Sequence, residues 1–183
     1  MLCGPFHGED VVVKAASQHD LKGMTRLLDE AKNYAQLLPL QGKALPRGKL
    51  YVARNPPVPP QATTAVPVTK YYGRTLAREV EDRDRTASES CERMPSIFRQ
   101  RIISTVAEVH DLGMELGCFA LNHIVRDETG LMVMVIGIAD AKPHSCGRPE
   151  YFEQGMVAPS AEDYECEELH YLCMDMHMWL HGL

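Results

Sequence analysis

Residues 98–140 constrain the fold most, because their pattern predicts a helix, a loop and two short strands in that order. Large apolar residues recur there at spacings of four, four and three, which gives a helix one buried face. They are Phe98, Ile102, Val106 and Val109. Ser96 stands at the expected N-cap, and the helix should end near Gly113. Residues 127–130 then predict a turn between the two strands.

The first half of the chain predicts a small antiparallel sheet. Residues 10–16 are a β-branched run that carries a lysine, Lys14, at its far end. Residues 49–53 and 66–72 are two further strand-like pieces. Between them, residues 55–67 (NPPVPPQATTAVP) are too rich in proline to continue a sheet or a helix. This segment is interpreted as an exposed hairpin connection or an insertion.

Residues 21–38 predict one long helix, with Asp20 as its N-cap. Its apolar positions follow a helical period. They are Met24, Leu27, Leu28, Ala31, Tyr34, Ala35 and Leu38. Glu30 lies in the middle of this helix.

The fold class expected from these elements is α+β, in two lobes. Residues 1–76 would form the sheet and the long helix. Residues 77–95, crowded with charges of both signs, would form a linker or hinge helix. Residues 96–183 would form a reduced helical lobe that closes with a terminal helix.

Composition excludes several classes of partner. The chain has 183 residues, 45% of them apolar, which suffices for one domain or two small lobes. A net charge of −6 without a cluster of lysine and arginine argues against nucleic acid as a partner. The apolar run at 131–139 is about half of what a bilayer crossing needs, so no membrane is expected. Six widely spaced cysteines are typical of reduced thiols in a cytoplasmic protein.

Five segments resemble, in chain order, the parts of a protein kinase active site. VVVKAAS resembles the strand with the ATP-binding lysine, LLDEAKNYAQL the helix with its glutamate partner, and VTKYYGRTL the strand and hinge that face adenine. EVHDLGM resembles the end of the helix before the catalytic loop, and ELGCFALN the loop itself. The chain is similar to the eukaryotic protein kinase-like family, particularly its short, divergent members in filamentous fungi and mushrooms. The resemblance implies a truncated kinase-like fold.

The resemblance also implies site residues. Lys14 would hold the α- and β-phosphates of ATP, Glu30 would pair with Lys14, and Asn122 would take the position of a magnesium ligand. ATP is therefore the expected cofactor.

Two catalytic positions of the family are occupied by other residues. Gly117 stands at the position of the catalytic aspartate and Glu115 at that of the histidine. Gly137 stands where the main magnesium ligand belongs, so no metal ligand is predicted, and Asp140 could replace it only after a rearrangement. Since positioned proton transfer contributes about 10²–10⁴ in rate, the resemblance implies an inactive kinase without bound magnesium.

The C-terminal segment resembles the compact ending of the fungal group, with an acidic helix of the type C-D-E-L-x-x-L-C. The large helical domain of a kinase would then be missing. Its absence should expose apolar surface that a protein partner could cover.

The last helix offers a second chemical interpretation. Five potential zinc ligands recur at spacings of four, three, four and four on one predicted face. They are Cys166, His170, Cys173, His177 and His181. One helix does not close a tetrahedral site, so His144 or Cys146 would have to join. The other interpretation is that these side chains flank the apolar stripe that packs on the core.

Three functional hypotheses follow. The first is a degenerate kinase-like domain, a pseudokinase, that acts as a binding or scaffold module. The alternative is an atypical ATP-dependent kinase that uses Lys14, Glu30 and Asn122 with Asp140 or Asp127 as a displaced acid. The third is a metal-stabilised interaction domain built on the last helix. A truncated relic without function also fits the sequence.

Overall fold

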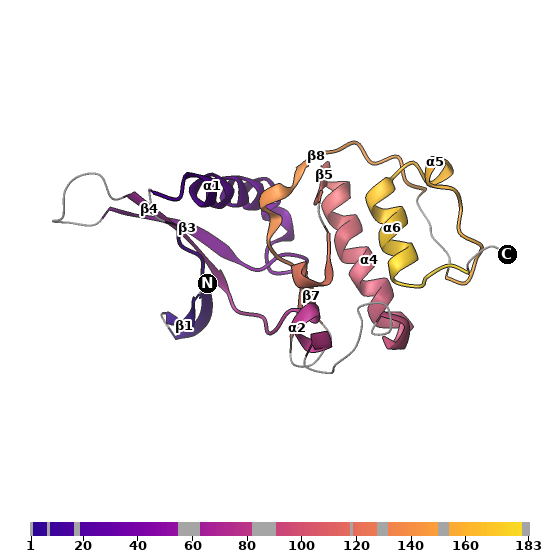
Figure 1. Ribbon diagram of the computed structural model, residues 1–183, viewed down its shortest axis with the longest axis horizontal. Coiled ribbons are helices and arrows are strands. Elements are labelled where there is room, and N and C mark those ends of the chain that lie inside the picture. Colours follow the sequence, from indigo (N-terminus) through magenta and orange to yellow (C-terminus); the bar gives the residue numbers. More distant parts are fainter. Residues whose placement is uncertain are drawn as a thin grey trace.

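The structure is a computed structural model of the chain. It describes residues 2–6, 8–16, 19–54, 63–81, 91–117, 119–127, 132–149 and 154–180. The fold is α+β, with small antiparallel sheets and several helices. The largest sheet forms one end of the molecule and helices α4 and α6 form the other, as Figure 1 shows.

A four-stranded antiparallel sheet has the strand order β1-β2-β4-β3. Its strands are β1 (Leu2–Phe6), β2 (Glu9–Val13), β3 (Gly48–Arg54) and β4 (Thr63–Lys70). β2 therefore lies inside the sheet, paired with β4 from Val11↔Lys70 to Val13↔Val68. The predicted strand at 10–16 is confirmed as β2, but it ends at Val13, so Lys14 follows the strand directly.

The hairpin predicted around the proline-rich segment is confirmed, because β3 and β4 pair antiparallel from Gly48↔Thr69 to Arg54↔Thr63. The connection is shorter than predicted, since β4 already begins at Thr63. Pro67 is tolerated in β4 because the pairing with β2 reaches only Val68. Residues 55–62 lie outside the described residues.

Helix α1 (Leu21–Gln36) contacts β3 and β4. Asp20 is the N-cap, as predicted, and its side chain accepts a hydrogen bond from the amide of Gly23 at 2.9 Å. The helix stops two residues earlier than predicted, because Pro39 has no amide to donate to the carbonyl of Ala35 and its ring clashes with that carbonyl in an α-helix. A 3₁₀ turn, η1 (Leu38–Leu40), follows it.

The second half is built from short elements around helix α4 (Ser96–Asp111). The others are α2 (Leu76–Glu81), β5 (Met114–Glu115), η2 (Leu121–His123), β6 (Ile124–Arg126), β7 (Val133–Val135), η3 (Ile138–Asp140), β8 (Lys142–Pro143), α5 (Ala161–Tyr164) and α6 (Glu167–Asp175). β6 pairs with β7 and β5 with β8, both antiparallel. Of the predicted linker at 77–95, residues 82–90 lie outside the described part.

The apolar stripe predicted for α4 is confirmed, because Phe98, Ile102, Val106 and Val109 are all buried. The prediction that Ser96 caps this helix is wrong. Pro95 is the N-cap residue, with an extended backbone, and it makes no side-chain cap hydrogen bond. Proline's fixed φ favours a helix start, so Ser96 is already the first helical residue.

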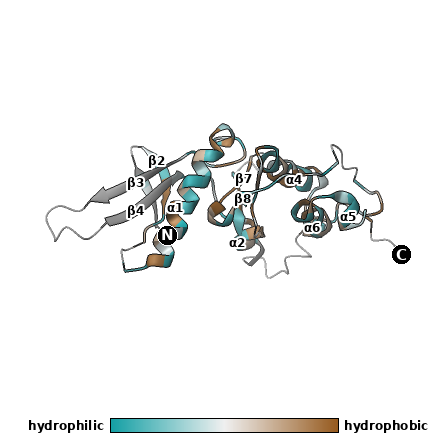
Figure 2. Cartoon of the chain, turned by 90° about the horizontal axis from the view of Figure 1, so that it is seen from above, coloured by the Kyte–Doolittle hydropathy of each residue, from teal (hydrophilic) through white to brown (hydrophobic). Residues whose placement is uncertain are grey.

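The main core lies between α4, α6, the β6–β7 pair and the end of α1. Helices α1, α4 and α6 each carry hydrophilic and hydrophobic residues, as the mixed colours in Figure 2 show. None of the helices in the described ranges is long and apolar enough to span a bilayer.

Candidate functional site

A cavity of about 570 Å³ lies between the four-stranded sheet and the β6–β7 pair. Its lining comes from β2, β4, β6, α1 and α2, and from the chain that joins β4 to α2. The lining residues are Val12, Lys14, Tyr34, Pro46, Thr69, Lys70, Tyr71, Gly73, Arg74, Thr75, Arg78, Val125 and Ile136. The cavity therefore gathers residues that are far apart in the sequence.

Lys14 and Glu30 meet at the wall of this cavity. The Lys14 ammonium lies 2.5 Å from Oε1 of Glu30. The Glu30 side chain is only 5% exposed, whereas 28% of the Lys14 side chain reaches solvent. Because Lys14 follows β2 and Glu30 faces inward from α1, the pair joins sheet and helix beside the cavity.

Gly73 lets the segment after β4 run close to β6. Its φ is +117°, a conformation that L side chains rarely adopt. A Cβ atom at this position would lie 2.3 Å from the carbonyl oxygen of Arg126. A side chain here would therefore push the cavity wall away from β6.

Gly117 lies in the loop between β5 and η2, with φ +76°. Its amide donates a hydrogen bond to Glu168 at 2.8 Å, and the amide of Leu116 donates to the same carboxylate at 2.9 Å. Glu115 forms an ion pair with Lys142 at 2.8 Å, and its other carboxylate oxygen lies 3.0 Å from Nδ1 of His144. The carboxylates beside this loop are therefore bound within the protein rather than directed at the cavity.

The segment after β7 is tied to helix α1. Gly137 adopts φ +70° and precedes η3. The buried side-chain amide of Asn33 donates hydrogen bonds to the carbonyl oxygens of Ile138 at 2.8 Å and Ala141 at 2.9 Å. Asp140 pairs with Arg26 of α1 at 2.5 Å.

The remaining candidates lie elsewhere. Asn122 is an exposed residue of η2 and is not among the cavity-lining residues. Asp127 follows β6, and its carboxylate accepts a hydrogen bond from the amide of Met132 at 3.0 Å. The structure thus brings Lys14 and Glu30 together at the cavity but does not bring Asn122 to its wall.

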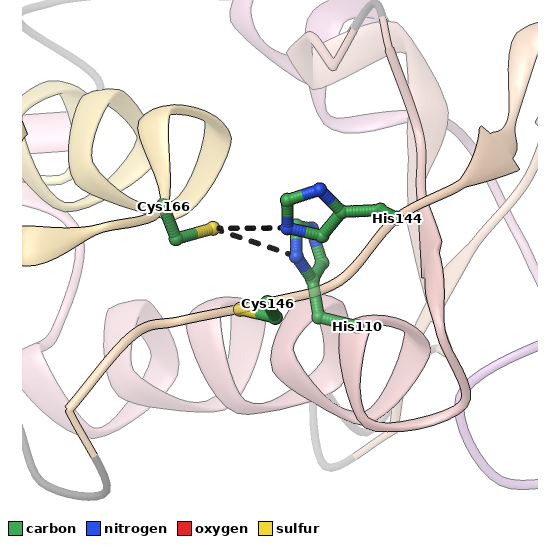
Figure 3. Close-up of side chains that lie close together, drawn as sticks. All are labelled: His110, His144, Cys146 and Cys166. Carbon is green, nitrogen blue, oxygen red and sulfur yellow. Dashed lines mark hydrogen bonds between the residues drawn. The ribbon is translucent and has the colours of Figure 1, made fainter.

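Besides the cavity, the structure brings together four potential metal ligands, here called the His/Cys cluster. They are His110, His144, Cys146 and Cys166. One potential metal-binding atom from each lies within 4.8 Å of the others. Figure 3 shows the four side chains gathered between α4, the start of α6 and the chain that follows β8.

The surroundings of this cluster stabilise positive charge beside thiolate. Burial lowers the pKa of His110, but hydrogen bonds with Cys166 and Glu168 outweigh this effect and raise the pKa to about 10. Burial raises the pKa of Cys146, but hydrogen bonds from the main chain and guanidinium of Arg148 outweigh it and lower the pKa to about 6. The cluster thus favours positive charge next to sulfur, and in the absence of a metal ion that charge is the proton on His110.

The predicted five-ligand stripe on the last helix is wrong. Glu165, at φ +54°, separates α5 from α6, and Cys166 is the N-cap of α6. His177 lies beyond the end of α6 at Asp175, and His181 lies outside the described residues. The sequence keeps a helical spacing of Cys and His from Cys166 to His181, but the backbone of α6 is helical only from Glu167 to Asp175.

His170 and Cys173 pack as the second interpretation predicted. His170 is buried, and its Nε2 atom donates a hydrogen bond to the carbonyl oxygen of Pro159 at 2.9 Å. Cys173 is fully buried.

His110, at the end of α4, was missed as a potential ligand because it belongs to a helix with an evident apolar stripe. The close spacing of His144 and Cys146 was the available sequence signal. Histidine and cysteine are both zinc ligands, so two of them in one loop can serve a metal ion when partners come from elsewhere in the chain.

Comparison with protein-family models and with curated proteins finds no match to this chain.

Proposed function

We propose that this protein contains a kinase-like domain that binds a nucleoside triphosphate such as ATP without transferring its phosphate. The observation that carries the proposal is the Lys14–Glu30 ion pair at the wall of the 570 Å³ cavity. A nearly buried glutamate that orients a partly exposed lysine presents one fixed cation to the cavity.

The cavity offers apolar walls for a base. Val12 of β2 lines it on the side of the large sheet, and Val125 and Ile136 line it on the side of the β6–β7 pair. A planar heterocycle between such walls buries both of its faces. Residues 69–71 and 73–75 also line the cavity, so the edge of the base would meet the backbone of this segment.

Charge supports a phosphate-bearing ligand. The charged residues among the described lining are all basic: Lys14, Lys70, Arg74 and Arg78. Cations around a partly apolar cavity attract a negatively charged ligand. The same charge pattern argues against a cationic or neutral lipid-like ligand.

Several observations support binding without transfer. The aspartate that would accept the substrate's proton is replaced by Gly117, and Glu115 is paired with Lys142 and His144. Asp140, the nearest substitute for the metal ligand at Gly137, is paired with Arg26 on the outside of α1. Phosphoryl transfer relies on such a metal ion to neutralise charge. Magnesium-dependent catalysis therefore remains the weaker alternative.

Calorimetric titration with ATP tests the proposal. Wild-type protein and the matched control Lys32→Ala, an exposed lysine of α1, should bind with the same affinity. Lys14→Ala should bind at least about tenfold more weakly, because one charge-assisted contact to phosphate contributes about 1.5–3 kcal/mol. The double variant Lys14→Met/Glu30→Leu removes the cation without leaving a buried charge, so it separates lost binding from lost folding. Equal affinity in all four proteins, or no binding by the wild type, would reject the proposal.

We further propose that a protein partner covers part of the second half. Met156, Val157 and Leu180 are 53%, 64% and 59% exposed, and a β-bridge joins Val157 to Leu180. Three adjacent exposed apolar side chains favour a contact surface. Replacing Met156 and Leu180 with Gln should weaken capture of that partner without changing ATP affinity, and loss of ATP binding instead would count against a separate surface.

A further inference from the structure

We propose that His110, His144, Cys146 and Cys166 form a structural zinc site. The proposal does not depend on nucleotide binding, because none of the four residues lines the cavity.

The spacing of the donor atoms fits tetrahedral zinc. Sγ of Cys166 lies 3.5 Å from Nδ1 of His110 and 3.8 Å from Nε2 of His144. With Zn–S and Zn–N bonds of ordinary length and tetrahedral angles, a nitrogen and a sulfur ligand are about 3.6 Å apart. One ion can therefore bridge these atoms with only small side-chain adjustments.

The outer nitrogen of each imidazole is held by a carboxylate. Nε2 of His110 lies 2.7 Å from Oε2 of Glu168, and Nδ1 of His144 lies 3.0 Å from Oε2 of Glu115. A hydrogen bond at the outer nitrogen fixes the tautomer and leaves the lone pair of the inner nitrogen for a metal ion. Both rings have this arrangement, and both inner nitrogens face Cys166, as Figure 3 shows.

The carboxylates of Glu168 and Glu115 are themselves fixed by further contacts. Glu168 accepts hydrogen bonds from the amides of Leu116 and Gly117, and Glu115 pairs with Lys142 at 2.8 Å. Arg148 donates to Sγ of Cys146 at 3.5 Å and is itself paired with Asp111 at 2.7 Å. The potential ligands are therefore oriented by a second layer of contacts, as in protein metal sites.

The ligand set favours zinc in a structural role. Two sulfurs and two nitrogens in tetrahedral arrangement are typical of zinc, whereas magnesium and calcium prefer oxygen. Four protein ligands leave no open position for a substrate or a water molecule. His110 is 2% exposed and Cys166 3%, so the ion would be largely shielded.

The site would join three parts of the second half. His110 lies in the last turn of α4, His144 and Cys146 follow β8, and Cys166 is the N-cap of α6, which has only nine residues. A metal ion that links these segments adds to the stability of the core that they share, because binding free energy becomes folding free energy.

Metal analysis of the purified full-length chain tests the proposal. Wild-type protein, grown with zinc and dialysed into metal-free buffer, should retain roughly one zinc ion per chain. The matched control Cys91→Ala, a free buried cysteine outside the cluster, should retain the same amount. Cys146→Ser should retain much less. Retention unchanged in Cys146→Ser, or folded wild-type protein without zinc, would overturn the proposal.

Two further measurements remain decisive if Cys146→Ser fails to fold. Titration of metal-free wild-type protein with Co²⁺ should give the intense visible absorption of a tetrahedral site with thiolate ligands. Glu168→Gln keeps all four ligands and should lower zinc affinity about 10–100-fold in a chelator competition. A weak octahedral cobalt spectrum, or an unchanged zinc affinity in Glu168→Gln, would contradict the assignment.

Discussion

At the scale of single residues, the Lys14–Glu30 pair should respond unequally to substitution. Lys14→Ala leaves a carboxylate that is 5% exposed without its partner, which should cost about 3–5 kcal/mol of unfolding free energy. Glu30→Ala leaves a lysine that is 28% exposed and can turn to solvent, so its cost should be smaller. Urea unfolding measures both. Equal losses, or a double variant Lys14→Met/Glu30→Leu less stable than Lys14→Ala, would contradict this account of the pair.

Position 73 requires glycine, because of its backbone conformation and its close approach to β6. Gly73→Ala should cost at least about 2 kcal/mol, because φ +117° strains an alanine and its Cβ would lie 2.3 Å from a carbonyl oxygen. Gly4→Ala is the matched control, since a Cβ there has no atom within 4 Å. Thermal unfolding of the two variants gives the comparison. A Gly73→Ala protein as stable as Gly4→Ala would show that β6 can move aside.

Some of these residues can be predicted from the sequence and others cannot. The pairing of Lys14 with Glu30 was implied by the resemblance of their two segments to the kinase strand and helix whose lysine and glutamate pair. His110 could not be found, because its partners lie 34 or more residues away along the chain and only the fold unites them.

At the scale of elements, the buried part of the contact between α1 and η3 is made by the side chain of Asn33, beside the exposed pair of Arg26 and Asp140. Asn33→Ala removes the donor to the carbonyls of Ile138 and Ala141, and an unpaired buried carbonyl costs about 1–3 kcal/mol. Hydrogen exchange at the amide of Ala141 should quicken, because that amide bonds Ile138 within η3. Gln36→Ala, an exposed site on the same helix, is the control. Unchanged exchange in Asn33→Ala would show that η3 is held by other contacts.

A helix or strand was predictable where a single periodic pattern of apolar residues ran along the whole element. The apolar stripe of α4 and the β-branched run of β2 are examples. The pattern misled at the C-terminus, where the helical period continues to His177 and His181 in the sequence although α6 ends at Asp175. His177 adopts φ +49°, a tertiary outcome that the periodic pattern does not indicate.

At the scale of the whole molecule, removal of zinc should destabilise the second half. An ion present at a hundred times its dissociation constant contributes about 2.7 kcal/mol, which corresponds to a rise of about 5–11 °C in Tm for a chain of this size. A chelator should therefore lower the Tm of wild-type protein and of Cys91→Ala by that amount, and leave Cys146→Ser unchanged. Calorimetry with and without chelator makes the comparison. The same Tm decrease in Cys146→Ser would show that the chelator acts on a metal ion bound elsewhere.

Nucleotide binding and the absence of phosphate transfer can be measured together in a ³¹P NMR spectrum of ATP with magnesium and excess protein. We expect the β- and γ-phosphate resonances to shift or broaden with wild-type protein and this change to be lost with Lys14→Met/Glu30→Leu. ATP should stay intact over hours. An unchanged spectrum would contradict the proposed binding site. Accumulation of ADP would show catalysis and reject the inactive interpretation.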